Sequence, residues 1–328
     1  MRAVMCASFG PLEQLKVEER EAPVCGPREV RIAVTAAGVN YVDALFAQGL
    51  YQIKPPLPFV PGNEIAGRVT EVGAEVTAFA VGDRVFANVG LGGFVSEVVL
   101  DARRVMPTPA AMTDGQAATF SQSYMTAWFA LHRRAAAMAG QWLLVLGAGG
   151  GVGLAAVDVG RAMGLHVIAG ASSDAKRAVA VERGAEATID TSSDDVKTRT
   201  REVLRDLDGP DGVDFVYDPV GGALADQALR TLRDDGQFLV IGFASGSIPQ
   251  LPANQVLLRN RRVTGVDWGG WVGQHQAENQ AMLADVVAAI SRGELNPVEP
   301  VAYPLDRVAD ALRDQFERRV TGKSVLVP

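Results

Sequence analysis

The sequence predicts an α/β protein of two parts, an all-β, barrel-like unit and a unit with a doubly wound parallel sheet. Three observations predict this architecture. Short β-branched runs fill the first third of the 328-residue chain, apolar runs alternate with longer helical stretches in its middle, and a glycine-rich turn follows the first of those apolar runs. Alternating short runs are typical of antiparallel strands, whereas near-continuous apolar runs are typical of parallel strands that helices cover on both faces.

The composition is that of a globular protein, with 48% hydrophobic and 21% charged residues. The net charge of −7 argues against a nucleic-acid partner, because phosphate contacts need clustered Lys and Arg side chains. Only two cysteines occur, Cys6 and Cys25, which favours a reducing, cytoplasmic setting. The uncharged stretch at residues 135–157 is interrupted by glycines, so we expect no membrane-spanning segment.

The expected elements follow one another in three segments. Residues 1–119 predict the barrel-like unit, with strand-like runs at 29–34, 68–73 and 83–87. Residues 120–265 predict the parallel sheet, with strands at 142–146, 166–169, 214–217 and 237–241. Residues 266–328 predict two helices and a last strand, at 281–290, 305–320 and 324–327.

A glycine-rich turn follows the predicted strand 142–146 and precedes a helix-like stretch. Backbone free of side chains lets a pyrophosphate approach the N–H groups and the positive end of a helix. The order of strand, turn and helix therefore predicts a dinucleotide-binding Rossmann unit, with a purely structural glycine turn as the alternative. The residues expected to contact the cofactor in this turn are Gly147, Gly150, Gly151, Val152 and Gly153.

The end of the second strand bears on the choice between NAD and NADP. An NAD site normally carries an acidic residue there, which binds the ribose 2′-hydroxyl. Here the first carboxylate is Asp174, and Ser172 or Ser173 as a helix cap would place it in the first turn of the next helix. The two serines, with Lys176 or Arg177, are instead suited to a 2′-phosphate, which predicts NADPH. A plain helix cap with solvated basic residues is the alternative.

Several motifs along the whole chain resemble one family. They are "AAGVNYVDALFAQGLY", "PFVPGNEIAG", "VGDRV", "YDPVGG", "VIGFASG" and "TGKSVLVP". In this order they are similar to the medium-chain dehydrogenase/reductase superfamily and, within it, to the zinc-independent quinone oxidoreductase branch related to zeta-crystallin. The resemblance implies a GroES-like catalytic domain made of residues 1–119 and a returning C-terminal segment 266–328, with the Rossmann domain 120–265 between them. It also implies a homodimer joined through edge strands, and residues 262–266 are the matching segment.

The same resemblance bears on zinc. In zinc-dependent relatives a Cys stands at the position of Asn40 and a His at that of Asn63. Catalytic zinc needs three protein ligands, usually His, Cys or carboxylate. The three histidines of this chain, His132, His166 and His275, all lie beyond residue 131. We therefore expect no metal.

The resemblance further implies which residues form the site. The positions that match the substrate and nicotinamide cleft hold Asn40, Asp43, Tyr51 and Tyr124. The positions that match cofactor contacts outside the glycine turn and the 172–176 segment hold Thr126, Phe243, Ala244, Asp267, Trp268 and Lys323. A mere helix cap is the alternative for Asp43, and simple packing is the alternative for Tyr51. One position departs from the pattern, because Thr191 stands where many relatives have a Tyr that helps to bind the 2′-phosphate.

These observations predict an NADPH-dependent reductase that delivers hydride to a quinone without zinc. A conjugated acceptor spreads the incoming charge onto its oxygen, so a few hydrogen-bond donors and an apolar slot suffice. Two alternatives stay open: a reductase of activated alkenes, such as a 2-alkenal, an enone or an enoyl thioester, and a non-catalytic NADPH-binding protein. The motifs concern the cofactor and leave the acceptor undefined.

Overall fold

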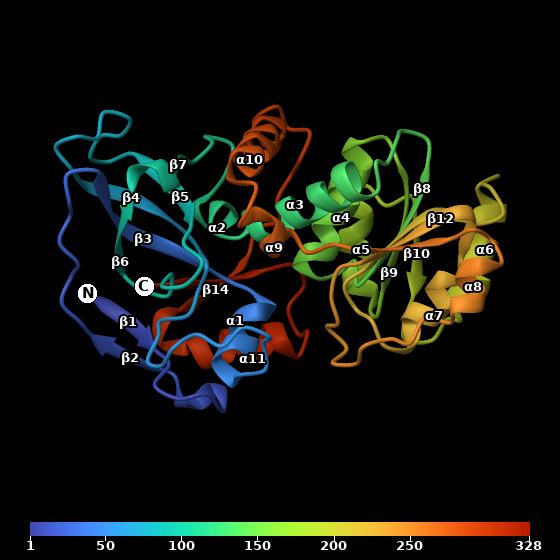
Figure 1. The fold of residues 1–328 in the computed structure, drawn as a ribbon, viewed down its shortest axis with the longest axis horizontal. Helices are drawn as coiled ribbons and strands as arrows, with labels where there is room; N and C mark the ends of the chain where they lie inside the picture. Colours follow the sequence, from blue (N-terminus) through green and yellow to red (C-terminus); the bar gives the residue numbers. More distant parts are fainter. The chain divides into compact units, whose positions relative to one another are not determined.

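The computed structural model describes all residues from 1 to 328 and divides them into two compact units (Figure 1). One unit, here called the β-rich unit, comprises Met1–Ser121 and Pro297–Pro328. The other, called the parallel-sheet unit, comprises Gln122–Asn296. The chain therefore leaves the β-rich unit once and returns to it for its last residues.

The β-rich unit is built on a seven-stranded sheet, in which the strand order is β14-β15-β3-β4-β5-β7 and β6 pairs with β3. β14 runs parallel to β15, and the other pairs are antiparallel. The strands are β3 (Glu29–Val39), β4 (Glu64–Val72), β5 (Arg84–Asn88), β6 (Glu97–Asp101), β7 (Met106–Pro107), β14 (Val301–Pro304) and β15 (Ser324–Val327). A separate antiparallel pair is formed by β1 (Arg2–Met5) and β2 (Lys16–Glu19).

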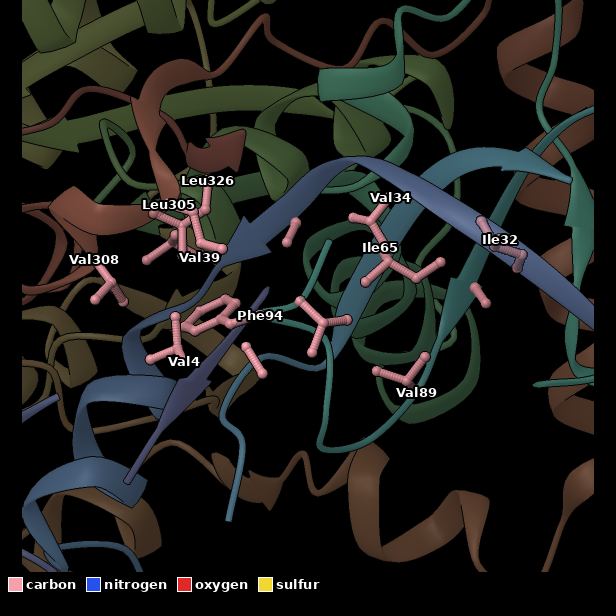
Figure 2. Packing of buried hydrophobic residues seen from close by; sticks show 14 of the residues in the cluster. Val4, Ile32, Val34, Val39, Ile65, Val89, Phe94, Leu305, Val308 and Leu326 are labelled. Atoms are coloured by element: carbon pink, nitrogen blue, oxygen red, sulfur yellow. The ribbon is translucent and has the colours of Figure 1, made fainter. Parts of the chain in front are cut away.

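The core of this unit follows from the alternation of apolar residues along β3, where Val30, Ile32 and Val34 are buried. Figure 2 shows Ile32 and Val34 in one cluster with Val4, Val39, Ile65, Val89, Phe94, Leu305, Val308 and Leu326. The cluster joins the first strands to the C-terminal helix α11 (Val308–Phe316) and to β15. The remaining helices of the unit are α1 (Tyr41–Gln48) and α2 (Asp114–Ala117), with short 3-10 turns at Leu12–Gln14, Ala102–Arg104 and Leu305–Arg307.

The parallel-sheet unit has six parallel strands in the order β10-β9-β8-β11-β12-β13, which is the order of a doubly wound dinucleotide-binding fold. The strands are β8 (Trp142–Leu146), β9 (His166–Ala171), β10 (Ala187–Asp190), β11 (Val213–Asp218), β12 (Leu232–Val240) and β13 (Arg262–Gly265). Every residue of β8 and of β11 is buried, as near-continuous apolar runs predict. The predicted fold class is confirmed.

Five helices of the parallel-sheet unit, α4 to α8, connect these strands, and two more, α9 and α10, follow the last strand β13. They are α4 (Gly151–Ala162), α5 (Asp174–Glu182), α6 (Val196–Asp206), α7 (Ala223–Leu229), α8 (Ala253–Leu257), α9 (Trp268–Val272) and α10 (Gln276–Ser291). The helix α3 (Phe120–Trp128) continues into a π-helical turn at Phe129–Arg134. Among all the helices, none combines the length and the apolar character that crossing a membrane requires.

The boundaries of the units differ from those expected. The first boundary falls after residue 121 instead of 119, and residues 266–296 group with the parallel-sheet unit instead of the C-terminal segment. The physical reason is packing onto the π-helical turn: the ring centroids of Phe129 and Trp271 lie 4.9 Å apart, and Arg133 forms an ion pair with Glu278 at 2.8 Å. The helix predicted at 305–320 is also shorter at both ends, because Leu305–Arg307 form a 3-10 turn and α11 spans Val308–Phe316.

Candidate active site

A cluster of buried polar side chains lies where β3 ends and α1 begins. Asn40 is the N-cap of α1, and its backbone N–H donates to Oδ2 of Asp43 at 2.8 Å. Asp43 is fully buried, and its other oxygen has no hydrogen-bond partner. Burial raises the pKa of Asp43 to about 7, although the Asn40 N–H and the charge of Lys323 act in the opposite direction. Asp43 is thus a helix cap, as the alternative reading holds, and also a carboxyl group that titrates near neutrality.

The side-chain amide of Asn40 is fully engaged within this cluster. Its Nδ2 donates to Oδ1 of Asn63 and to Oε2 of Glu64, both at 2.8 Å. Its Oδ1 accepts from the ammonium group of Lys323. Because the amide has one acceptor atom and two N–H donors, these three partners fix its orientation. Both N–H groups point into the protein, which leaves neither for the substrate contact expected of Asn40.

Two further groups complete the charge arrangement. Glu64, the first residue of β4, is 1% exposed and accepts at Oε1 from the hydroxyl of Ser121 at 2.8 Å. Lys323 directly precedes β15, is 5% exposed, and places its Nζ 3.9 Å from Oε2 of Glu64. Burial lowers the pKa of Lys323, while the carboxylates of Glu64 and Asp43 counteract it. We call Asn40, Asp43, Asn63, Glu64, Ser121 and Lys323 the buried polar cluster.

The buried polar cluster does not fit a catalytic zinc ion. Its candidate ligands at the two expected positions are amide oxygens, which are poor zinc ligands beside His and Cys. The ammonium of Lys323 is bonded to Oδ1 of Asn40, and a cation cannot share that oxygen without displacing it. Nowhere in the 328 residues does the structure gather three or more His, Cys, Asp or Glu side chains in a metal-binding arrangement.

Tyr51, another residue expected at the site, lies in the β-rich unit, and its hydroxyl is available to donate a hydrogen bond to a ligand. Its ring is half-buried and packs on Phe46 of α1, with the ring centroids 4.7 Å apart and the planes at 60°. Its hydroxyl makes no hydrogen bond within the β-rich unit. Tyr51 therefore combines the packing contact of the alternative reading with a free donor.

Tyr124 is bonded inside the parallel-sheet unit. Its buried hydroxyl donates to Oδ2 of Asp158 at 2.8 Å, and burial together with Asp158 raises the pKa of Tyr124. Asp158 is 1% exposed and also accepts from Arg161 at 2.8 Å and from the N–H of Asn296 at 2.6 Å. Tyr124 thus fastens α3 to α4. Thr126 is occupied as well, because its hydroxyl donates to the carbonyl of Gln122 at 2.7 Å.

The glycine turn between β8 and α4 has the backbone geometry that a diphosphate needs. Gly147 has a φ of 60°, and a Cβ on Gly153 would lie 2.2 Å from the carbonyl oxygen of Gly147, so neither position tolerates a side chain. Gly150 is the N-cap of α4, and no side chain caps this helix. The N–H groups of its first turn, at Gly151, Val152 and Gly153, therefore stay available to an anion. These residues fit a dinucleotide.

The segment after β9 has the cap geometry expected from the sequence. Ser173 is the N-cap of α5 and accepts from the N–H of Lys176 at 3.4 Å, which places Asp174 in the first turn. The stem of Lys176 lies against the glycine turn, because a Cβ on Gly149 would be 2.5 Å from its Cβ. Arg177 is held in ion pairs with Asp174 and Asp190. Ser172, which is exposed, Ser173 and Lys176 remain the candidates for a 2′-phosphate, and Arg177 is committed elsewhere.

The remaining expected cofactor residues separate into three groups. Phe243, which is 37% exposed, and Ala244, whose N–H donates to the carbonyl of Pro219 at 3.0 Å, follow β12 in a loop. Asp267 caps α9 and Trp268 donates to Asn279 at 2.9 Å, so these two side chains are used internally and only their backbone is available. Lys323 belongs to the buried polar cluster, where its ammonium is engaged.

Sequence reasoning missed Ser121 and Asp158 and treated Glu64 only as a companion of Asn63. Asp158 carried a signal, because it is a single carboxylate within the otherwise apolar stretch 154–159. Glu64 carried a similar signal, since it opens an apolar strand. Nothing near Ser121 in the sequence indicates its bond to Glu64, which is 57 residues away.

Comparison with known proteins defines the class to which this fold and site belong. Residues 26–110 match the alcohol dehydrogenase GroES-like domain, and residues 151–288 match the family described as zinc-binding dehydrogenase. A quinone oxidoreductase-like protein 2 homolog from Nematostella vectensis is 38% identical over 99% of this chain and 88% of its own length.

Solved structures agree with this assignment. The quinone oxidoreductase of Pseudomonas syringae is 30% identical, with a TM-score of 0.86 over 100% of this chain and 99% of its own. The Escherichia coli quinone oxidoreductase complexed with NADPH is 26% identical, with a TM-score of 0.86 over the whole of both chains. The chain belongs to the quinone oxidoreductase branch of the medium-chain dehydrogenase/reductase superfamily, as the motifs predict.

Proposed function

We propose that this protein is an NADPH-dependent quinone oxidoreductase that works without zinc. The relatives named above support the quinone, and the Escherichia coli structure, which contains NADPH, supports the cofactor. The proposal rests on two features of the same chain. The glycine turn at the start of α4 leaves backbone N–H groups available to a diphosphate, and the buried polar cluster contains two asparagines and a lysine instead of metal ligands.

Each unit has its own role in this proposal. NADPH, when bound, supplies the hydride. In the parallel-sheet unit, the first-turn N–H groups of α4 hold the diphosphate, and Ser172, Ser173 and Lys176 recognise the 2′-phosphate. In the β-rich unit, the hydroxyl of Tyr51 donates to the acceptor oxygen, on which negative charge develops during hydride transfer. Asn40 holds the start of α1 through the buried polar cluster and does not itself donate to the acceptor.

The experiment that tests this function is a panel of acceptors with the purified protein. Naphthoquinone, a 2-alkenal and a crotonyl thioester are each offered with NADPH and with NADH. We expect the highest kcat/KM for naphthoquinone with NADPH. A preference for either alkene would identify the enzyme as an activated-alkene reductase, and NADPH binding without turnover of any acceptor would identify a non-catalytic binding protein.

Tyr51→Phe tests the proposed donor in the same assay. Removing one hydrogen-bond donor that acts on transition-state charge typically lowers turnover on the order of 100-fold. The matched control is Tyr303→Phe, which removes a hydroxyl that donates to Asp314 at 3.0 Å in the same unit. Unchanged turnover in Tyr51→Phe would remove this residue from the mechanism and leave it a packing role.

Zinc independence has a direct measurement. We expect elemental analysis to find no stoichiometric zinc and the activity to survive prolonged chelation, because the buried polar cluster offers no ligand set. About one zinc per chain, with activity lost on chelation, would refute the proposal.

We also propose a cytoplasmic homodimer. Both cysteines are free, which suits a reducing compartment. The strand β13 is the last of its sheet and exposes Val263 to 44%, so its outer edge is open to a second copy of the chain.

A further inference from the structure

We propose that Lys323 supplies a positive charge to the buried polar cluster and positions Asn40 through its ammonium group. Because Asn40 caps α1 and Tyr51 packs on Phe46 of α1, Lys323 thereby positions Tyr51 as well. The inference rests on the proposed function for its catalytic part. Its structural part, the coupling of Lys323 to Glu64 and Asn40, stands on the geometry alone.

The first step is the burial of opposite charges. The side chains of Lys323 and Glu64 are 6% and 1% exposed, and their charged atoms lie 3.9 Å apart. An ammonium or a carboxylate removed from water is strongly disfavoured unless an opposite charge and hydrogen bonds accompany it. The other partners of Glu64 in the cluster, Asn40 and Ser121, are neutral donors. Lys323 places a positive charge beside this buried carboxylate.

The second step is the orientation of the Asn40 amide. Oδ1 of Asn40 faces Lys323, and Nδ2 faces Asn63 and Glu64. A flipped amide would direct two N–H donors at an ammonium, which has no acceptor. The lysine thus reinforces the one orientation of Asn40 that Asn63 and Glu64 also favour, and a neutral apolar side chain in its place would remove the lysine's share of this restriction.

The third step leads from Asn40 to Tyr51. Asn40 caps α1, and its N–H is bonded to Asp43 in the first turn. At the other end of α1, Gly49 adopts a left-handed φ of 67° and the N–H of Leu50 donates to Leu45 at 2.9 Å, which returns the chain toward the helix. The next residue, Tyr51, packs on Phe46. A shift of the start of α1 is therefore transmitted to the ring of Tyr51.

The fourth step concerns the cation itself. The side-chain oxygen of Asn40 accepts a hydrogen bond from the ammonium group of Lys323. The positive charge at this place is thus part of the polypeptide. The ammonium group is buried against Asn40 and Glu64, so we assign Lys323 as a positioning residue and not a catalytic one.

The test is a double-mutant cycle between Lys323→Met and Glu64→Gln, with thermal unfolding, kcat and the KM for NADPH measured for each protein. Each single variant removes one member of the buried Lys323–Glu64 pair and leaves the charge of the other, so we expect each to lower Tm more than the double variant does. We expect the double variant to regain stability but to keep a kcat reduced on the order of tenfold, with the KM for NADPH unchanged, because the residues that we propose to hold the diphosphate and the 2′-phosphate lie in the other unit. Lys16→Met, which removes an exposed lysine from β2, is the matched control.

Two results would overturn the inference. A double variant that is no more stable than the single variants, or that does not fold, would show that Lys323 and Glu64 are not coupled. A double variant with both wild-type stability and wild-type kcat would show that the cation does not position the site. A wild-type protein without turnover on any acceptor would instead refute the proposed function, and the stability cycle would still decide the structural part.

Discussion

At the scale of single residues, burial acts on two groups of the buried polar cluster in opposite directions. It raises the pKa of Asp43 to about 7 and lowers the pKa of Lys323. Both shifts bring the neutral forms of these side chains closer to physiological pH. The cap of α1 is therefore sensitive to pH in a range where ordinary carboxylates are not.

Asp43 makes the stability of the protein depend on pH. An unfolded Asp titrates near about pH 3.9, so between about pH 4 and 7 the folded carboxyl keeps a proton that the unfolded chain has lost. The contribution of Asp43 to the free energy of unfolding is thus fully present below about pH 4 and falls by up to about 1.4 kcal/mol per pH unit until about pH 7. We expect Asp43→Asn to remove this decline in Tm, measured from about pH 4.5, just above the unfolded pKa, to about pH 8, one unit above the folded pKa. Asp306→Asn, at an exposed position of the same unit, should keep it; equal slopes in all three proteins would contradict the pKa assigned to Asp43.

Substitution of Lys176 tests directly whether the protein prefers NADPH to NADH. Its stem lies beside the glycine turn, and one charge-assisted hydrogen bond to the 2′-phosphate is worth roughly 1.5–3 kcal/mol. We expect Lys176→Ala to weaken the binding of NADPH by this amount and to leave NADH nearly unaffected, as measured by titration of each cofactor. Lys197→Ala, on α6 of the same unit, is the control. Equal losses for both cofactors would show that Lys176 does not bind the phosphate.

At the scale of elements, Asp158 joins three segments of the parallel-sheet unit. Its carboxylate on α4 binds Tyr124 of α3, Arg161 of α4 itself and the N–H of Asn296, the last residue of the unit. Both ends of the unit are therefore attached to one buried carboxylate. Within this arrangement, Tyr124 is a buried link between α3 and α4.

Tyr124→Phe separates this structural role from the role in the cleft that the family motif implies. It removes one hydrogen bond to Asp158 while the carboxylate keeps its other two partners, so we expect a loss of about 1 kcal/mol in the free energy of unfolding. We expect the kcat of the folded enzyme to stay at the wild-type value. A large fall in kcat without a loss of stability would restore Tyr124 to the mechanism.

The open edge of β13 is the element on which the proposed dimer depends. A lysine on an edge strand discourages pairing with another sheet, so Val263→Lys should produce a monomer in light scattering coupled to gel filtration. Val301→Lys is the matched control, because Val301 is 48% exposed on β14, the edge strand of the other sheet. A dimer that survives Val263→Lys and dissociates in Val301→Lys would place the interface on the β-rich unit.

At the scale of the whole molecule, sequence reasoning succeeded where structure is determined locally. The bounds predicted for the first parallel strand, 142–146, and for the last strand, 324–327, agree with β8 and β15, because apolar runs between turn residues define both. The glycine turn was found for the same reason, since the strand, turn and helix are consecutive in the chain.

Sequence reasoning failed where distant segments meet. The boundary at residue 265 was set too early because the contact between Trp271 and Phe129 is invisible in a linear pattern. The roles of Asn40 and Lys323 depend on a hydrogen bond across 283 residues, and that of Tyr124 on one across 34. Motifs identified these residues as important, but only the packed structure shows which of their polar atoms are already engaged.

We propose that the protein transfers hydride directly from NADPH to a quinone without a metal. The most direct test follows the nicotinamide absorbance with naphthoquinone as acceptor, using NADPH deuterated on either face of its hydride-bearing carbon, before and after chelation. The account predicts oxidation that depends on the quinone, a primary isotope effect for one face only, and the same rate after chelation. Oxidation that does not depend on the quinone, or that stops on chelation, would contradict it.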